Sequence, residues 1–188
     1  MSTNKPRRLW RRVAAPAAIA ALVVTVSVVS SGSAKNVSRQ KQLEAAAAAV
    51  TKPPPALLPA SGKTLGGFTS QQLPVVLQVA KKDKRLDLVG TALNMTCTSG
   101  DQLVLPDGWV KLPLSKKGVI NASIQLPPSG PPSATTVTVT GGTDAFSGKL
   151  NAKKATFAGT WDLHLDFSMP NNQTDQCDSG HVTFKTVL

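Results

Sequence analysis

From Phe68 onward the chain alternates apolar and polar residues over short runs, and this pattern constrains the fold more than any other feature. Such alternation is typical of strands with one buried face, and clusters of Gly, Pro, Asn and Asp between the runs are typical of turns. The pattern predicts an antiparallel all-β domain, either a β-sandwich or a small flattened barrel of about 8–9 strands. The strands are expected at 73–80, 84–97, 102–105, 109–114, 119–126, 134–140, 144–151, 154–169 and 180–187.

Turn residues separate the expected strands. Pro106-Asp107-Gly108 divides 102–105 from 109–114, and Gly141-Gly142 divides 134–140 from 144–151. Short groups of Gly, Pro and Asp commonly reverse the direction of the chain, so we interpret both segments as turns.

The segment 144–169 predicts the most distinct hairpin, with its turn at residues 151–153. Successive side chains of a strand point to opposite sides, so alternate residues share a face. The first arm places Phe146, Gly148 and Leu150 on one face. The second arm places there Phe157, Gly159, Trp161, Leu163, Leu165 and Phe167, and we expect this face in the core.

Residues 1–34 have the composition of a membrane-targeting segment. Five cations precede an uncharged, mostly apolar run at 13–29, and small residues follow up to Ala34. The run is longer than the apolar core of a usual signal peptide, about 7–15 residues, and near the lower limit of about 17–25 for a spanning helix. Two interpretations stay open. An uncleaved signal-anchor through 13–34 leaves the later domain extracellular on the cell membrane, and cleavage near Ala34 releases a secreted protein.

Residues 35–67 are expected to form a basic, disordered Ala/Pro-rich linker between the targeting segment and the β-domain at 68–188. The run 40–50 can form a short helix, and Pro53-Pro54-Pro55 ends it. Most of the net charge of +11 lies before residue 68, where 1–34 carries +5 and 35–67 carries +4. The β-domain holds eleven cations and nine acids, so we expect no nucleic-acid partner.

Cys97 and Cys177 are the two cysteines of the chain. In an exported domain two cysteines usually pair, and each stands in a similar phrase, Cys97-Thr98-Ser99-Gly100 and Cys177-Asp178-Ser179-Gly180. We therefore expect a Cys97–Cys177 disulfide between neighbouring sheet ends. The alternative is a redox-active or metal-binding thiol pair, which the spacing and the absence of an adjacent His do not favour.

One strand offers a candidate metal site. Asp162, His164 and Asp166 alternate and so share a face, and His181 can join them if the last strand pairs alongside. The same alternation is typical of a solvated strand face, which is the simpler interpretation. No cofactor and no catalytic residue is expected.

Asp178-Ser179-Gly180 is similar to the nucleophile motif of trypsin-like serine proteases. The Gly residues that flank that motif in the family are replaced by Cys177 and His181, and the chain is too short for the family's double barrel. A structural turn is the simpler interpretation, and we do not expect an enzyme.

Three phrases, CTSGDQLVLPDGWVKLPLSKKGVINASI, FSGKLNAKKATFAGTWDLHLDF and CDSGHVTFK, resemble a family of uncharacterised exported β-rich domains from high-GC Gram-positive bacteria. The resemblance covers about 68–188. It implies an exported, disulfide-bonded β-domain and no known activity.

These patterns favour a non-enzymatic, envelope-associated binding module whose partner is a cell-envelope component or another extracellular protein. The alternative is a barrel-type carrier of a small molecule, and a metal-dependent or serine hydrolase ranks third. A packed interior with an exposed apolar patch would favour the interaction module. A cavity of several hundred Å³ near Trp109 or Trp161 would favour the carrier. His164 and His181 converging on one point would favour a metal site.

Overall fold

The computed structural model describes residues 34–51, 62–132 and 135–188, which form one α-helix, nine strands and a single 3-10 turn. Residues 1–33 of the candidate targeting segment and the Pro-rich run at 52–61 lie outside the described residues. No described helix is both long and apolar enough to cross a bilayer. The elements are α1 (Ala34–Ala48), β1 (Lys63–Thr69), β2 (Pro74–Val79), β3 (Arg85–Cys97), β4 (Gln102–Pro113), β5 (Val119–Leu126), β6 (Thr138–Asn151), β7 (Thr156–Met169), η1 (Pro170–Asn172), β8 (Gln173–Asp178) and β9 (Val182–Val187).

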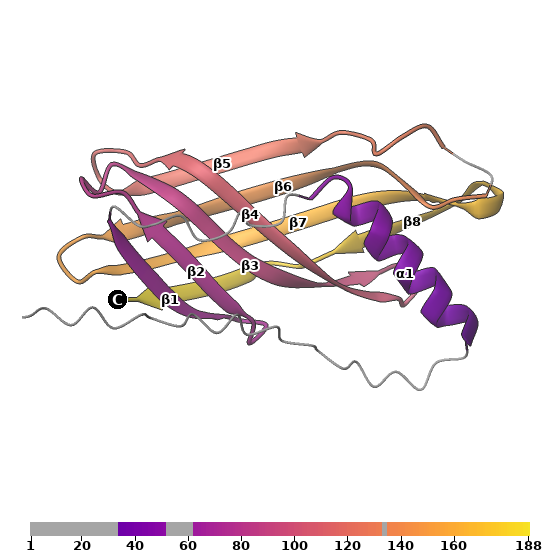
Figure 1. The fold of residues 1–188 in the computed structure, drawn as a ribbon, viewed down its shortest axis with the longest axis horizontal. Helices are drawn as coiled ribbons and strands as arrows, with labels where there is room; N and C mark the ends of the chain where they lie inside the picture. Colours follow the sequence, from indigo (N-terminus) through magenta and orange to yellow (C-terminus); the bar gives the residue numbers. More distant parts are fainter. Residues whose placement is uncertain (1–33, 52–61, 133–134) are drawn as a thin grey trace, which may run out of the picture. The chain divides into compact units, whose positions relative to one another are not determined.

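All strand pairs among the described residues are antiparallel, and six strands close into a barrel in the order β3-β2-β1-β9-β7-β8. The remaining strands extend this ring, because β4 pairs with β3 from Arg85 to Thr96 and β6 pairs with β7 and then β5 (Figure 1). The all-β expectation is confirmed, and the barrel is the form that the sheet takes.

The hairpin expected at 144–169 is confirmed as β6 and β7. Phe146 lies opposite Trp161 and Leu150 lies opposite Phe157, so the large side chains of both arms share the inner face. Phe146 and Trp161 meet edge to face with their ring centroids 5.2 Å apart. Their burial, with that of Phe157 and Phe167, removes a large apolar area from water and makes this hairpin the centre of the core.

Two expected turns are instead interior parts of strands. Pro106-Asp107-Gly108 lies inside β4, which is continuous from Gln102 to Pro113. On its other side β4 carries no strand ladder among the described residues, so Pro106 needs no N–H for one. Gly141-Gly142 lies inside β6 next to an irregularity in the ladder. A side chain at Gly142 would collide with the His164 carbonyl, so this glycine permits close strand packing.

The described parts of 35–67 are not the plain linker that the composition predicted. The segment 63–69 forms β1, which pairs on both sides with β2 and β9. Its alternation is weak because it contains two glycines and one fully buried apolar residue, Leu65. The strand β8 was also missed, since its sequence QTDQCD is almost entirely polar.

The helix α1 belongs to the core. Leu43 and Ala47 are fully buried, Ala46 is nearly so, and Val50 packs against the same cluster. This i, i+3, i+4, i+7 spacing forms one apolar face, and α1 lies against β4 and β6 (Figure 1). The small alanines let the helix approach the strands closely. The expectation of a linker failed here because five successive alanines resemble low-complexity sequence.

We predict that Leu43→Ala lowers the free energy of unfolding by about 2–5 kcal/mol, because it leaves a cavity in a packed core. Urea unfolding of the full chain measures this. Gln42→Ala is the matched control on the exposed face of the same helix and should change stability by less than about 0.5 kcal/mol. Equal unfolding midpoints for the two variants would restore the linker interpretation.

Candidate functional site

The expected disulfide is present between Cys97 and Cys177, with a sulfur–sulfur distance of 1.96 Å. The two cysteines lie opposite each other where β3 pairs with β8, and only Thr96–Asp178 extends this pairing. Cys97, Asp175 and Cys177 are the one group of potential metal ligands that the described residues gather. Both sulfurs are bonded to each other, so they are not available as thiolate ligands.

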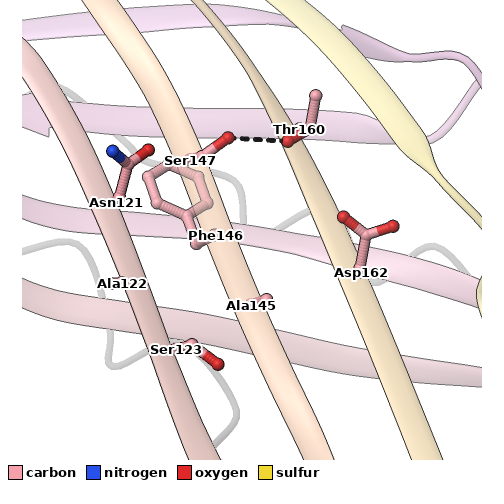
Figure 2. A pocket seen from close by; sticks show the side chains of 8 residues that line it. All are labelled: Asn121, Ala122, Ser123, Ala145, Phe146, Ser147, Thr160 and Asp162. Atoms are coloured by element: carbon pink, nitrogen blue, oxygen red, sulfur yellow. Dashed lines mark hydrogen bonds between the residues drawn. The ribbon is translucent and has the colours of Figure 1, made fainter.

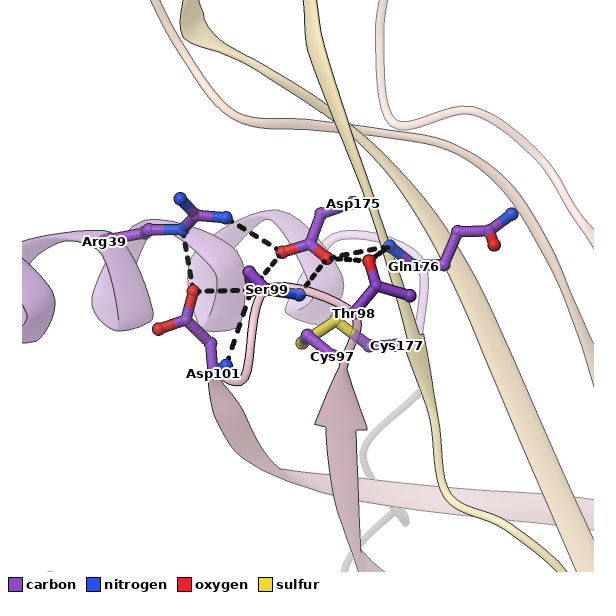
Figure 3. Close-up of polar contacts among 8 residues, drawn as sticks. All are labelled: Arg39, Cys97, Thr98, Ser99, Asp101, Asp175, Gln176 and Cys177. Atoms are coloured by element: carbon purple, nitrogen blue, oxygen red, sulfur yellow. Dashed lines mark hydrogen bonds and ion pairs between the residues drawn. A yellow bond between two sulfur atoms is a disulfide. The ribbon is translucent and has the colours of Figure 1, made fainter.

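Asp175 is the polar centre of this corner (Figure 3). Its carboxylate accepts hydrogen bonds from Thr98 Oγ1 at 2.7 Å, Ser99 Oγ at 2.6 Å and the Ser99 N–H at 3.1 Å. The Arg39 Nη2 donates to it from α1 at 3.0 Å. Arg39 also lies 2.7 Å from Asp101, so one side chain ties the helix to both strand ends. The corner is therefore a structural clasp for α1.

Burial alone raises the pKa of Asp175, but the hydrogen bonds from Ser99 and Thr98 and the Arg39 guanidinium outweigh it. The pKa of this carboxyl is therefore lowered from its ordinary value of 3.8. A carboxylate of this kind stabilises the fold above the unfolded-state pKa, and the contribution is lost as the pH falls through the folded-state pKa.

We predict that Asp175→Asn lowers the free energy of unfolding by roughly 1–3 kcal/mol at pH 7, since it removes the charge that these donors satisfy. The difference from the unmodified protein should shrink as the pH falls below 3.8, the ordinary carboxyl pKa, toward the lower folded-state pKa at which Asp175 takes up a proton. Urea unfolding at pH 7 and pH 3 measures both values. Asp87→Asn, which breaks an exposed contact with Arg85, is the control and should cost about 0–1 kcal/mol. A pH-independent difference for Asp175→Asn would contradict this account.

The four candidate metal ligands fall into two separate contacts. His181 Nδ1 lies 3.1 Å from Asp162, while His164 lies between Asp166 at 3.2 Å and Asp178 at 3.3 Å. All of these side chains are at least one third exposed. The groups of close potential ligands in the described chain do not include Asp162, His164, Asp166 or His181. These side chains therefore lie on a solvent-exposed face of β7 and its neighbours.

A shallow hollow of about 330 Å³ lies beside Asp162 on the outer face of β5, β6 and β7 (Figure 2). Ser147 and Thr160 form a hydrogen bond of 2.8 Å across it, so each satisfies the other. Asn121 and Ser123 complete the polar part of the lining. No charged pair or exposed aromatic ring among the lining residues provides a strong recognition group.

Ser179 is held as part of a turn. Its hydroxyl accepts from the Leu163 N–H at 2.9 Å and donates to the Gly180 carbonyl at 2.9 Å. His164 forms its contacts with Asp166 and Asp178 instead. Among the described residues, therefore, Ser179 has no base positioned to activate it as a nucleophile.

The best candidate for a ligand-binding site lies beside Pro106-Asp107-Gly108, where the sequence analysis placed a turn. A cavity of about 460 Å³, which we call the Trp109 cavity, lies between the C-terminal end of α1 and strands β4, β5 and β6. Most of its lining is apolar, and its polar part contains two carboxyl groups and an indole. The lining residues are Ala49, Val50, Thr51, Asp107, Gly108, Trp109, Val110, Ile124, Leu126, Pro127, Asp144 and Leu163.

The two carboxyl groups of the cavity are buried, with Asp107 2% and Asp144 4% exposed. Burial and, secondarily, repulsion by Asp144 raise the pKa of Asp107 to about 8. Burial raises the pKa of Asp144 to about 6, although the Trp161 Nε1–H donates to it at 2.9 Å and opposes the rise. Because the pKa values of both acids are raised, near pH 7 the pair shares one proton and holds about one negative charge.

Two polar atoms at this cavity have incomplete hydrogen bonding. Asp107 Oδ1 accepts from the Gly108 N–H at 2.8 Å, whereas the buried Asp107 Oδ2 has no donor among the described residues other than the proton that the pair shares. The Trp109 N–H lowers the pKa of Asp144 but reaches hydrogen-bond geometry with no described partner. A carboxylic acid beside a carboxylate can exchange a proton, hold a cation or hydrogen-bond a ligand.

The sequence contained a signal for this site that the turn interpretation hid. Leu103, Leu105, Asp107 and Trp109 alternate, so one strand would carry the acid on its apolar face. Asp144 similarly alternates with Phe146. An acidic residue that alternates with apolar residues along a strand indicates a site of this kind, because a buried charge requires a partner.

Comparison with known proteins found no matching family model and no significant match among curated proteins. The resemblance to exported β-domains therefore stays a prediction, and a functional proposal rests on the geometry of the cavity.

We predict that Asp107→Asn flattens the pH dependence of stability between pH 6 and pH 8. An acid whose pKa rises on folding stabilises the protein below its unfolded-state value and loses this contribution as the pH rises through its folded-state value. The unmodified protein should therefore lose roughly 1 kcal/mol per pH unit as Asp107 approaches its pKa of about 8. Asn keeps a donor toward Asp144 but does not titrate.

Urea unfolding at pH 6, 7 and 8 measures this slope. Asp162→Asn, a change at an exposed acid, is the control and should keep the slope of the unmodified protein. If Asp107→Asn and the unmodified protein show the same slope, Asp107 is ionised in the folded state across this range.

Proposed function

We propose that this protein is an exported, non-enzymatic binding protein that holds a small, largely apolar molecule in the Trp109 cavity. The observation that carries the proposal is the cavity itself. Its volume of about 460 Å³ lies within the range of roughly 300–1,000 Å³ of small-molecule sites. Its lining also has the composition of such sites, with many apolar side chains and a few convergent polar groups.

The polar groups of the described lining are suited to recognition. They are two carboxyl groups, the Trp109 indole and the Thr51 hydroxyl, and they include no His, Cys or Lys. The Thr51 hydroxyl donates to the Ala47 carbonyl at 3.2 Å, which ends α1 at the cavity and leaves the hydroxyl engaged. These groups orient a ligand and supply no activated nucleophile.

Export is part of the proposal and is supported by two features. The basic and apolar composition of residues 1–34 favours membrane targeting, with 13–34 as the membrane contact. The Cys97–Cys177 disulfide favours an oxidising compartment. The protein would then bind its ligand outside the cytoplasm, on the membrane or secreted.

The interaction module remains the second candidate because of one exposed patch. Phe68, Val187 and Leu188 are 64%, 53% and 75% exposed. They lie on the paired strands β1 and β9 and at the adjacent C-terminus. Apolar side chains gathered on a surface are typical of a contact with another molecule. Salt-resistant co-sedimentation of the full chain with cell-wall sacculi, lost in Phe68→Gln, would support this candidate.

We predict that the full chain binds the neutral apolar dye N-phenyl-1-naphthylamine with a stoichiometry of one. Ala49→Phe should weaken this binding at least tenfold, because the new ring occupies the cavity that Ala49 lines. A fluorescence titration measures both affinities. Ala48→Phe is the matched control, since Ala48 is an equally exposed neighbour that does not line the cavity. Equal dye affinities in the two variants would place binding elsewhere and reject the proposal.

A further inference from the structure

The Trp109 cavity contains a negative charge that no described residue neutralises. The ion pairs of the described residues involve Asp83, Asp87, Asp101, Asp162, Asp166, Asp175 and Asp178, and none involves Asp107 or Asp144. An isolated buried charge is costly, and proteins pair such a charge with a cation or neutralise it with a proton. The proton that Asp107 and Asp144 share neutralises one of the two carboxylates, so a cation is needed to balance the negative charge of the other.

The chemistry around the pair favours an organic cation over a metal ion. Calcium and magnesium require six or more oxygen ligands, and the rest of the lining is mainly the apolar side chains of Val50, Val110, Ile124 and Leu126. An ammonium group needs two or three acceptors, which the two carboxyl groups provide. Indole rings also attract cations, and Trp109 lines the same cavity.

We propose that the ligand of the Trp109 cavity is a small organic amine, whose ammonium group binds Asp107 and Asp144 while its apolar body contacts Val110, Ile124 and Leu126. This inference rests on the proposed function, because it names the ligand class of the same cavity. Asp107 Oδ2 and the Asp144 carboxylate are the acceptors that the ammonium approaches, because the described residues offer Oδ2 no donor beyond the proton that it shares with Asp144.

The proposal implies that binding releases a proton. Below the Asp144 pKa of about 6 both acids are protonated, and an ammonium group beside the pair favours the ionised form of one of them, so one proton leaves to solvent while the other stays shared by the pair. The affinity should therefore rise with pH as long as the amine itself stays charged, which holds below about pH 10.

Asp107 and Asp144 are the titratable groups of the described lining. The strand β5 has no titratable residue. Among the side chains that the structure describes, the charged or titratable residues of α1, β3, β4, β6 and β7 outside the lining are Arg39, Lys41, Glu44, Arg85, Asp87, Lys111, Lys149, Asp162, His164 and Asp166.

Three probes with the same aromatic body test the charge preference. They are 2-phenylethylammonium, neutral 2-phenylethanol and anionic phenylacetate. Binding to the full chain is followed by the NMR signal of the Trp109 indole N–H, assigned by its loss in Trp109→Phe. The ammonium probe should bind at least tenfold more tightly than the alcohol at pH 7. Phenylacetate should bind more weakly than both. The dissociation constant of the ammonium probe should rise at least tenfold between pH 8 and pH 5.

A double variant and one control assign the preference to the acid pair. Combined in one protein, Asp107→Asn and Asp144→Asn should remove most of the advantage of the ammonium probe over the alcohol, because no acid then remains to carry the charge, and Asp162→Asn should retain it. Because the comparison of the three probes uses the unmodified protein, the inference can be rejected even if the double variant fails to fold.

The outcomes separate this inference from the proposed function. Equal affinity for the ammonium and alcohol probes, with binding blocked by Ala49→Phe, overturns the cation preference and leaves the binding function. Binding of the dye without binding of any of the three probes also overturns the cation preference and leaves the binding function. If neither the dye nor the probes bind, both this inference and the proposed function are rejected.

Lys52 follows Thr51 in sequence and lies outside the described residues. If the ammonium probe binds only in Lys52→Gln, the chain supplies its own cation and the inference is wrong.

Discussion

Closure of the sheet between β3 and β8 is the constraint on which the rest of the molecule depends. The two strands share a ladder of only two residue pairs, Thr96–Asp178 and Cys97–Cys177. Such a short ladder provides little stabilisation, and the disulfide makes the closure covalent. A cross-link between residues 80 positions apart removes entropy from the unfolded chain, worth about 4.5 kcal/mol on the chain-entropy model. Without this closure the six-strand ring would open at its shortest seam.

The same corner positions the candidate site through α1. Asp175 and Asp101 hold Arg39 in the first half of the helix, and Leu43 and Ala47 then pack into the core. The helix ends at the Trp109 cavity, where Val50 and Thr51 form part of the wall. A helix fixed at one end by charge and along its length by packing can present a defined wall at its other end. The clasp and the cavity are thus linked through one rigid element.

The fold was largely predictable where a strand has one clearly apolar face. The β6–β7 hairpin illustrates this, since its aromatic residues recur with a period of two and dominate the core. Prediction failed for β1 and β8, which have few apolar residues and are held by partners on both sides. The short helix expected at 40–50 is largely present in the longer α1, but its packing into the core was missed, because a helix this short gains most of its stability from the strands that it contacts. The cavity was missed because Asp107 follows a proline and precedes a glycine, a local pattern typical of a turn.

The sequence by itself determined the all-β class, the central hairpin and the pairing of the two cysteines. These features follow from residue periodicity and from the chemistry of cysteine, which are local properties. Only the tertiary structure decided that Asp107 and Asp144 meet, because they come from strands that are distant in sequence and not hydrogen-bonded to each other. Their shared proton, their burial and the cavity beside them exist only where α1, β4 and β6 come together, since burial depends on all the surrounding elements at once.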